Sequence, residues 1–168
     1  EAARAIAMLS YRHYQTYQRT QAEPNDEKID GFRASSYQRY QGLKLRKRFN
    51  VWSYFALSRA MDSHNVGRGR GGVGAALQHI RAKTFAIGIQ SDVLFPTTEQ
   101  ERIAAHVPNA RFEVIASNYG HDGFLIETEA ITKLLRPIFD GKWRESDKKN
   151  KKITSLHMPI ALPGTEKF

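Results

Sequence analysis

TFAIGIQSDVLFPTTEQERIAAHVPNARFEVI, residues 84–115, is the stretch of sequence that decides the fold. It begins with Thr84–Ile89, a short and mostly apolar run of the kind found in parallel sheets. A second such run, Arg111–Ile115, ends it, and a helix is predicted between the two over about residues 97–106. A further helix is predicted from Phe124 to Phe139. Strand, helix, strand and helix at this spacing predict an α/β fold with parallel strands.

Two strands are too few for a stable parallel sheet that is covered on both faces. We therefore expect residues 65–139 to form part of a larger α/β domain. A flexible Gly-rich connection over residues 67–72 and a short helix near residues 73–80 lead into its first strand. Residues 140–168 are rich in lysine and are expected to form a basic tail.

The structure predicted for residues 1–64 is helical. Asn50 is a candidate N-cap of the last of its helices, and Ser35 or Ser36 of the one before, because these side chains accept from free backbone N–H groups. The apolar residues that recur at helical intervals here are expected to pack. The expected helices run near residues 2–19, 36–48 and 51–62.

The composition excludes several classes of protein. The 168 residues suit one domain, and no apolar run approaches the roughly 20 residues of a membrane helix, so no membrane partner is expected. The absence of cysteine excludes disulfides, a thiolate nucleophile and Cys-ligated zinc. His64 has no partner at metal-ligand spacing, so no metal site is predicted. The start of the sequence lacks a secretory pattern, and a cytoplasmic location is expected.

The net charge of +9 is unevenly distributed along the chain. The excess of lysine and arginine lies in the first third and in the tail, whereas residues 61–140 are close to neutral. A solvated basic surface accounts for this pattern, so no nucleic-acid partner is expected. An alternative of another class is a non-enzymatic basic binding module that uses residues 37–49 and the tail.

Catalytic side chains of open α/β sheets collect just beyond the C-terminal ends of the strands. Asp92 follows the first predicted strand and His121 follows the second. This order matches the acid and the base of a hydrolase-type triad, in which the base takes the nucleophile's proton and the acid fixes its tautomer. The alternative is that Asp92 caps the loop before Pro96 and that His121 is a surface turn residue.

A nucleophilic serine should precede Asp92 on a Gly-flanked elbow. No serine before that position has glycine two residues before and two residues after it, and no His-Gly-Gly stretch offers an oxyanion hole. The sequence thus contains two members of a triad and no nucleophile.

Four blocks of the sequence resemble the homoserine O-acetyltransferase family. They are LSYR (residues 9–12), SYQRYQGLKLRKRFNVWSYFALSRAMDSHNVGRGRGG (36–72), GIQSDVLFP (88–96) and YGHDGFLIETEA (119–130). The resemblance implies the C-terminal portion of an α/β-hydrolase fold, with residues 1–64 as part of an inserted helical lid. It also implies that the nucleophilic serine and the oxyanion hole lie in an N-terminal half that these residues do not include.

The resemblance assigns roles to five residues. Asp92 and His121 match the acid and base of the family's triad. Asp122 matches the residue that binds the amino group of the substrate, although it is also placed to cap the following helix. Arg4 and Tyr11 match lid residues that contact the substrate carboxylate, and their i, i+7 spacing puts them on one helix face.

The resemblance implies transfer of acetyl from acetyl-CoA, a co-substrate rather than a bound cofactor, to the hydroxyl of L-homoserine in methionine biosynthesis. Related activities with succinyl-CoA, L-serine or another alcohol stay open. The implied partners are the serine-bearing N-terminal half and a second copy in a homodimer. The isolated chain is expected to be inactive. The roles of Arg68 and Arg70 in the Gly-rich loop stay open between contact with CoA phosphates and a structural hinge.

Overall fold

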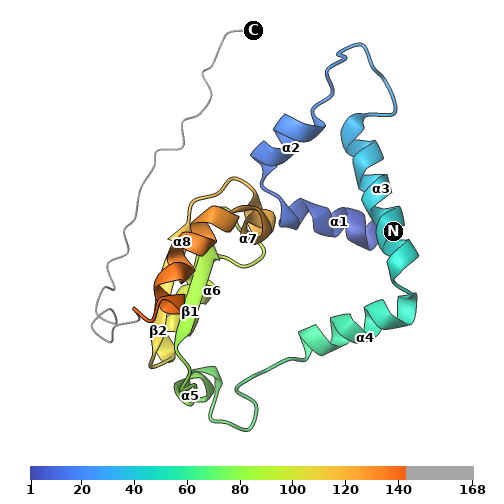
Figure 1. Cartoon of the computed structure of the whole chain (residues 1–168). Coiled ribbons are helices and arrows are strands. Elements are labelled where there is room, and N and C mark those ends of the chain that lie inside the picture. The colour runs from blue at the N-terminus through green and yellow to red at the C-terminus, as the bar shows by residue number, and fades with distance from the viewer. Residues whose placement is uncertain (143–168) are drawn as a thin grey trace.

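The computed structural model describes residues 1–142, so the predicted basic tail over residues 140–168 lies almost wholly outside the described residues. The elements follow one another as α1 (Ala2–Tyr11), α2 (Tyr14–Gln21), α3 (Arg33–Arg48), α4 (Val51–Asp62), α5 (Val73–Gln78), β1 (Thr84–Ile89), α6 (Thr97–His106), β2 (Ala110–Ile115), the 3₁₀ turn η1 (Gly120–Asp122), α7 (Gly123–Ile126) and α8 (Thr128–Phe139). Figure 1 shows α1 to α4 on one side of the molecule and the two strands with α5 to α8 on the other.

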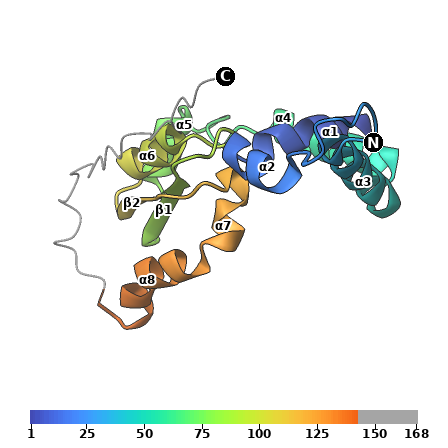
Figure 2. The ribbon, with the colours of Figure 1, turned by 90° about the horizontal axis from the view of Figure 1, so that it is seen from above.

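The two strands form a parallel sheet. The register runs from Thr84 opposite Ala110 to Ile89 opposite Ile115. Helix α6 connects the strands and packs on both of them, and Figure 2 shows the strands between α6 and α8. At Gly88 the helix comes so close that a Cβ would lie 2.9 Å from Cγ2 of Thr97. Both predicted strands and the helix between them are confirmed, with β2 starting one residue before Arg111.

The apolar core gathers at the sheet. Ile89 and Ile115, the last residues of the two strands, are 4% and 5% exposed. Burying each isoleucine stabilises the fold by about 1.5–3 kcal/mol, so the C-terminal edge of the sheet is its best-anchored part. The other buried apolar residues of this core are Ala76, Leu77, Ala86 and Val107.

Helices α1, α2 and α3 pack against one another, because α3 contacts both α1 and α2. A Cβ at Gly42 of α3 would lie 2.9 Å from the carbonyl oxygen of Glu1, so the two helices cross in direct contact. Arg46 adds an ion pair, with Nη1 2.8 Å from Oε1 of Glu1. Helix α4 buries no residue and exposes Trp52 and Met61, among other apolar side chains. Within residues 1–142, no helix combines the length and the apolarity that crossing a membrane requires.

The predicted helix over residues 2–19 is wrong, because the chain breaks between α1 and α2. Arg12 is extended (φ −123°, ψ 143°), and His13 starts α2 as an N-cap whose ring accepts from the backbone N–H of Gln15. The loop around Gly120 lies against this break, so a continuous helix is replaced by a tertiary contact. Sequence periodicity does not report such a contact.

Two further helix expectations need correction. The helix predicted from Phe124 to Phe139 is split at Glu127, where ψ is 47°, into α7 and α8. Helix α3 starts at Arg33 rather than at residue 36, so Ser35 and Ser36 lie in its first turn and do not cap it. The N-cap predicted at Asn50 is confirmed, since its Oδ1 accepts from the N–H of Ser53 at 2.7 Å.

Candidate functional site

Asp92 and His121 meet beyond the C-terminal edge of the sheet. Asp92 follows β1 by three residues, and His121 lies in η1 after β2. Because the strands are parallel and in register, their ends bring the two loops to the same edge. Nδ1 of His121 lies 2.8 Å from Oδ2 of Asp92, within hydrogen-bonding distance.

The carboxylate of Asp92 is held at both oxygens. Its other oxygen, Oδ1, accepts from the backbone N–H groups of Leu94 at 2.8 Å and Phe95 at 2.9 Å. The side chain is 6% exposed, so its orientation is fixed in a nearly dry setting. The sequence left open whether Asp92 caps the loop or contacts His121. In the structure its two carboxylate oxygens do both.

The His121 loop depends on a glycine. Gly120 has φ of 63°, and its N–H donates to Oγ of Ser91 at 3.0 Å. A Cβ at this position would lie 2.7 Å from the backbone N of His13, and this distance is shorter than real Cβ contacts. Both the left-handed backbone and the close approach thus require glycine here.

The imidazole of His121 lies among three aromatic rings. The ring centroids of Tyr11, Phe95 and Phe124 lie 5.5, 5.1 and 5.2 Å from it. The His121 side chain is 18% exposed. In the tautomer that directs the Nδ1 proton at Asp92, Nε2 carries the lone pair and can accept a proton. Within residues 1–142, Nε2 forms no hydrogen bond.

The two serine hydroxyls near this site are hydrogen-bonded to backbone N–H groups. Oγ of Ser91 accepts from Gly120, and Oγ of Ser117 accepts from the N–H of Tyr119 at 3.1 Å. In the part of the chain that the structure describes, no serine hydroxyl is hydrogen-bonded to His121. The expectation from the sequence, two triad members without a nucleophile, stays a prediction.

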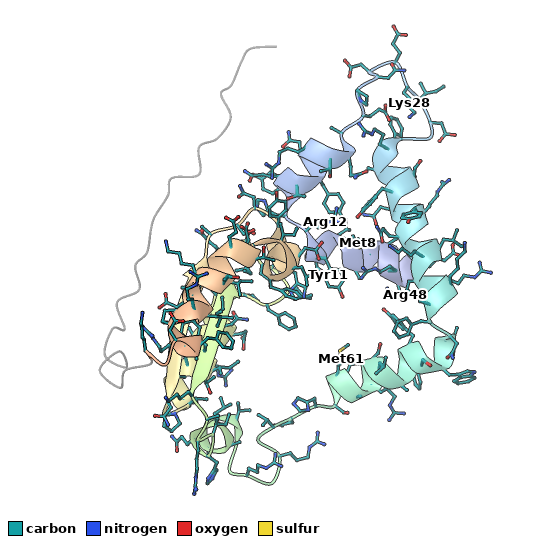
Figure 3. The ribbon with its side chains drawn as sticks, in the orientation of Figure 1. Met8, Tyr11, Arg12, Lys28, Arg48 and Met61 are labelled. Carbon is teal, nitrogen blue, oxygen red and sulfur yellow. The ribbon has the colours of Figure 1, made fainter. Side chains whose placement is uncertain are left out.

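Arg4 and Tyr11 lie together on α1, as their spacing predicts. The guanidinium carbon of Arg4 lies 4.8 Å from the centroid of the Tyr11 ring, and this ring in turn contacts His121. Figure 3 shows Tyr11 at the end of α1 that points toward α7. The structure thus places Tyr11 next to His121 and Arg4 against the Tyr11 ring, and the contact of these two residues with a substrate stays a prediction.

Asp122 does not cap the following helix through its side chain. Its Oδ2 lies 3.0 Å from Nε of Arg12, and the two side chains are about one-quarter exposed, at 26% and 28%. Asp122 therefore belongs to an ion pair with the end of α1. Its proposed contact with a substrate amino group stays a prediction.

Sequence reasoning missed several parts of the site. Arg12 was not recognised as the partner of Asp122, and Phe95 and Phe124 were not recognised as neighbours of His121. The only signal was proximity in sequence, since Arg12 follows Tyr11 and Phe95 lies three residues beyond Asp92.

One pKa near the site is displaced. Burial raises the pKa of Tyr17, with the neighbouring Tyr37 acting in the same direction. The hydroxyl of Tyr17 donates to the carbonyl of Met8 at 2.8 Å, and this bond ties α2 to α1. Residues 1–142 contain no group of three or more His, Cys, Asp or Glu side chains able to hold a metal ion.

Comparisons with known proteins agree with the resemblance. The chain is 52% identical over 139 residues to "Homoserine O-acetyltransferase" of Cyclobacterium marinum. The matched region covers 83% of this chain and 39% of that protein. It is 43% identical over 135 residues to the protein of the same name from Chlorobaculum tepidum, covering 80% of this chain and 37% of that protein. The chain spans less than two-fifths of the length of these relatives. No protein-family model matches it.

A solved structure supports the fold. The X-ray crystal structure of homoserine O-acetyltransferase from Bacillus anthracis matches with a TM-score of 0.72, over 80% of this chain and 39% of that chain. The sequence identity of 14% means that this match shows the fold alone. The predicted class, a C-terminal portion of an α/β-hydrolase fold, is confirmed.

Proposed function

Because this chain belongs to the homoserine O-acetyltransferase family, we propose that it supplies the acid and the base of an acyltransferase. The reaction moves an acetyl group from acetyl-CoA to the hydroxyl of L-homoserine, a step of methionine biosynthesis. The observation that carries this proposal is the hydrogen bond between Nδ1 of His121 and Oδ2 of Asp92. The nucleophilic serine comes from a part outside these 168 residues, and we call this chain together with that part the assembled enzyme.

In the first half-reaction, Nε2 of His121 takes the proton of the serine hydroxyl as its oxygen attacks the thioester carbonyl. The resulting imidazolium is stabilised by Asp92, whose carboxylate is held by two backbone amides. The C–S bond then breaks, the proton passes from His121 to the leaving CoA sulfur, and an acetyl-serine is left.

In the second half-reaction, the same Nε2 takes the proton of the homoserine hydroxyl. The hydroxyl oxygen attacks the acetyl-serine, and His121 returns the proton to the serine oxygen as the C–O bond to serine breaks. His121 is thus unchanged after each full cycle.

The carboxylate and the ammonium of the acceptor each have a candidate binding group near His121. We propose that Arg4 and Tyr11 bind the carboxylate of homoserine, since a guanidinium and a phenol both donate hydrogen bonds to it. Asp122 binds the ammonium. The support is that the Tyr11 ring contacts His121, that Arg4 lies over this ring, and that Asp122 follows His121 in sequence.

Transfer to homoserine competes with hydrolysis, so water must be kept away from the acetyl-serine. The proposed barrier is the helical lid segment, residues 1–64, together with the rings of Tyr11, Phe95 and Phe124 around His121. The rings take up space that water would otherwise fill.

We further propose that the assembled enzyme is a cytoplasmic homodimer. The exposed apolar side chains of α4, among them Trp52 and Met61, support an assembly that covers them. Size-exclusion chromatography with light scattering tests the dimer. A monomeric assembled enzyme contradicts this part of the proposal.

The experiment for the activity combines the chain with a serine-bearing part and follows O-acetyl-L-homoserine by mass spectrometry. The expected result is product formation with acetyl-CoA and L-homoserine, and none with the 168-residue chain alone. Parallel reactions with succinyl-CoA and with L-serine decide the acyl donor and the acceptor. The assigned substrate pair is overturned if the enzyme turns over with succinyl-CoA but not with acetyl-CoA, or with L-serine but not with L-homoserine.

A further inference from the structure

Arg12 lies where three elements meet. It is the extended residue at the break between α1 and α2, and Figure 3 shows it beside Tyr11 near α7. Its Nε donates to Oδ2 of Asp122 at 3.0 Å, and its guanidinium carbon lies 5.4 Å from the centroid of the Tyr37 ring on α3. One side chain therefore joins the first helices to the loop that carries His121.

Two further contacts attach the same break to the same loop. The backbone of Gly120 lies so close to the break that a Cβ would be 3.0 Å from the carbonyl oxygen of Tyr11. The hydroxyl of Thr16, which is 5% exposed, donates to the carbonyl of Asn118 at 2.6 Å. These contacts fix the distance between the two segments, and the Arg12–Asp122 pair fixes a charged side chain at their junction.

We propose that Arg12 is a positioning residue that acts through Asp122. By holding Oδ2, it orients the carboxylate so that Oδ1, which has no hydrogen bond within residues 1–142, is the oxygen available to the ammonium of the amino-acid acceptor. The inference rests on the proposed function for its kinetic consequence. Its structural consequence, an ordered loop over residues 118–124, does not depend on that function.

Lysine cannot fully replace Arg12. The Nε–H of arginine lies in a rigid plane and the guanidinium stacks on an aromatic ring, whereas lysine is a flexible point charge. Arg12→Lys therefore keeps the charge beside Asp122 and loses the defined geometry. Arg19 is exposed on α2 in the same segment, and Arg19→Ala is the matched control for removal of a positive charge.

The kinetic arm uses the assembled enzyme. Arg12→Ala is expected to raise KM for the acceptor about tenfold, the effect of losing one charge-assisted hydrogen bond, with acetyl-serine formation unchanged. Arg12→Lys should recover part of this loss, and Arg19→Ala should resemble the unmodified enzyme. A KM for Arg12→Ala equal to that of Arg19→Ala overturns the proposal. So does an equal loss in both half-reactions.

The second arm uses the full 168-residue chain and needs no activity. Hydrogen exchange of the amides in residues 118–124 should be about fivefold faster in Arg12→Ala than in Arg19→Ala, because one partly buried tether of the loop is lost. If Arg12→Ala loses the native circular dichroism, Arg12→Lys decides in its place. Unchanged exchange in the folded variant overturns the positioning role even where the acetyltransferase assay fails, so failures of the two proposals are distinguishable.

Discussion

Nδ1 of His121 lies 2.8 Å from Oδ2 of Asp92, although 29 residues of sequence separate the two. The contact exists because β1 and β2 are parallel neighbours whose last residues, Ile89 and Ile115, are paired and buried. The loop after β1 carries Asp92 and the loop after β2 carries His121, so the two side chains meet at this edge of the sheet. The sheet therefore positions His121, and the backbone amides that hold Oδ1 of Asp92 leave its Oδ2 facing Nδ1 of His121.

Asp92→Asn should abolish most of the acetyl transfer. The amide oxygen of asparagine would take over the bonds from Leu94 and Phe95, so that its NH₂ group faces Nδ1 of His121. His121 then places its proton on Nε2 and cannot act as a base. We expect kcat of the assembled enzyme to fall by about 10³–10⁴. Asp26→Asn, at an exposed position, is the control, and an equal kcat for both variants would refute the orienting role of Asp92.

Arg4→Ala should affect the second half-reaction alone. Loss of the guanidinium over the Tyr11 ring removes a proposed partner of the acceptor carboxylate, so KM for L-homoserine should rise about tenfold. Formation of acetyl-serine, measured by intact mass after mixing with acetyl-CoA, should be unchanged. The control is Arg39→Ala on the exposed side of α3. Loss of acetyl-serine formation would contradict substrate contact by Arg4.

Gly120→Ala should destabilise the chain more than a glycine substitution in open space. The added Cβ would clash with the backbone N of His13. In addition, alanine would be strained at the left-handed φ of 63°. We expect a loss of about 3 kcal/mol in the free energy of unfolding, measured by urea titration. Gly31→Ala has a similar φ of 66° with nothing within 4 Å of the Cβ, and about 1–2 kcal/mol is expected. Equal losses in the two variants would show that the close approach at Gly120 is unimportant.

Tyr17→Phe should change how stability depends on alkaline pH. Burial raises the pKa of Tyr17, so the unfolded chain loses this proton before the folded chain does. The stability from the protonated hydroxyl is therefore fully present below the unfolded pKa of about 10 and is lost as pH rises from there through the folded pKa.

The measurement compares urea midpoints at about pH 8 and about pH 10.5. Tyr17→Phe should be less stable than the unmodified chain at the lower pH, because its hydrogen bond to Met8 is lost, and the difference should shrink at the higher pH. Tyr14→Phe, at an exposed position, is the control. A difference that grows with pH would contradict the direction of the pKa change.

The sequence predicted the two strands and the meeting of Asp92 with His121 for a local reason. The apolar runs of β1 and β2 are short and clearly bounded, and the rule that parallel strands end at a common edge places Asp92 near His121 without any structure. The resemblance added Arg4, Tyr11 and Asp122. The structure places Tyr11 against His121 and Arg4 against Tyr11, and the roles of all five residues stay predictions.

The errors arose where tertiary contacts decide local structure. Periodicity predicted one helix through Arg12, and the approach of Gly120 replaces it by a break. The pairing of Arg12 with Asp122 spans 110 residues, a separation about which helical spacing carries no information. The division into a lid segment over residues 1–64 and a core over residues 65–139 stays a prediction, as does the nature of the tail.

The most direct test of the central claim is the rate of acetyl transfer to L-homoserine in assembled enzymes that differ only in one histidine of this chain. The unmodified enzyme and a control His79→Asn should transfer acetyl at similar rates. His121→Asn should be slower by about 10³-fold or more while its circular dichroism and urea midpoint are retained. Transfer by a folded His121→Asn enzyme at the rate of the control would contradict the assignment of His121 as the base.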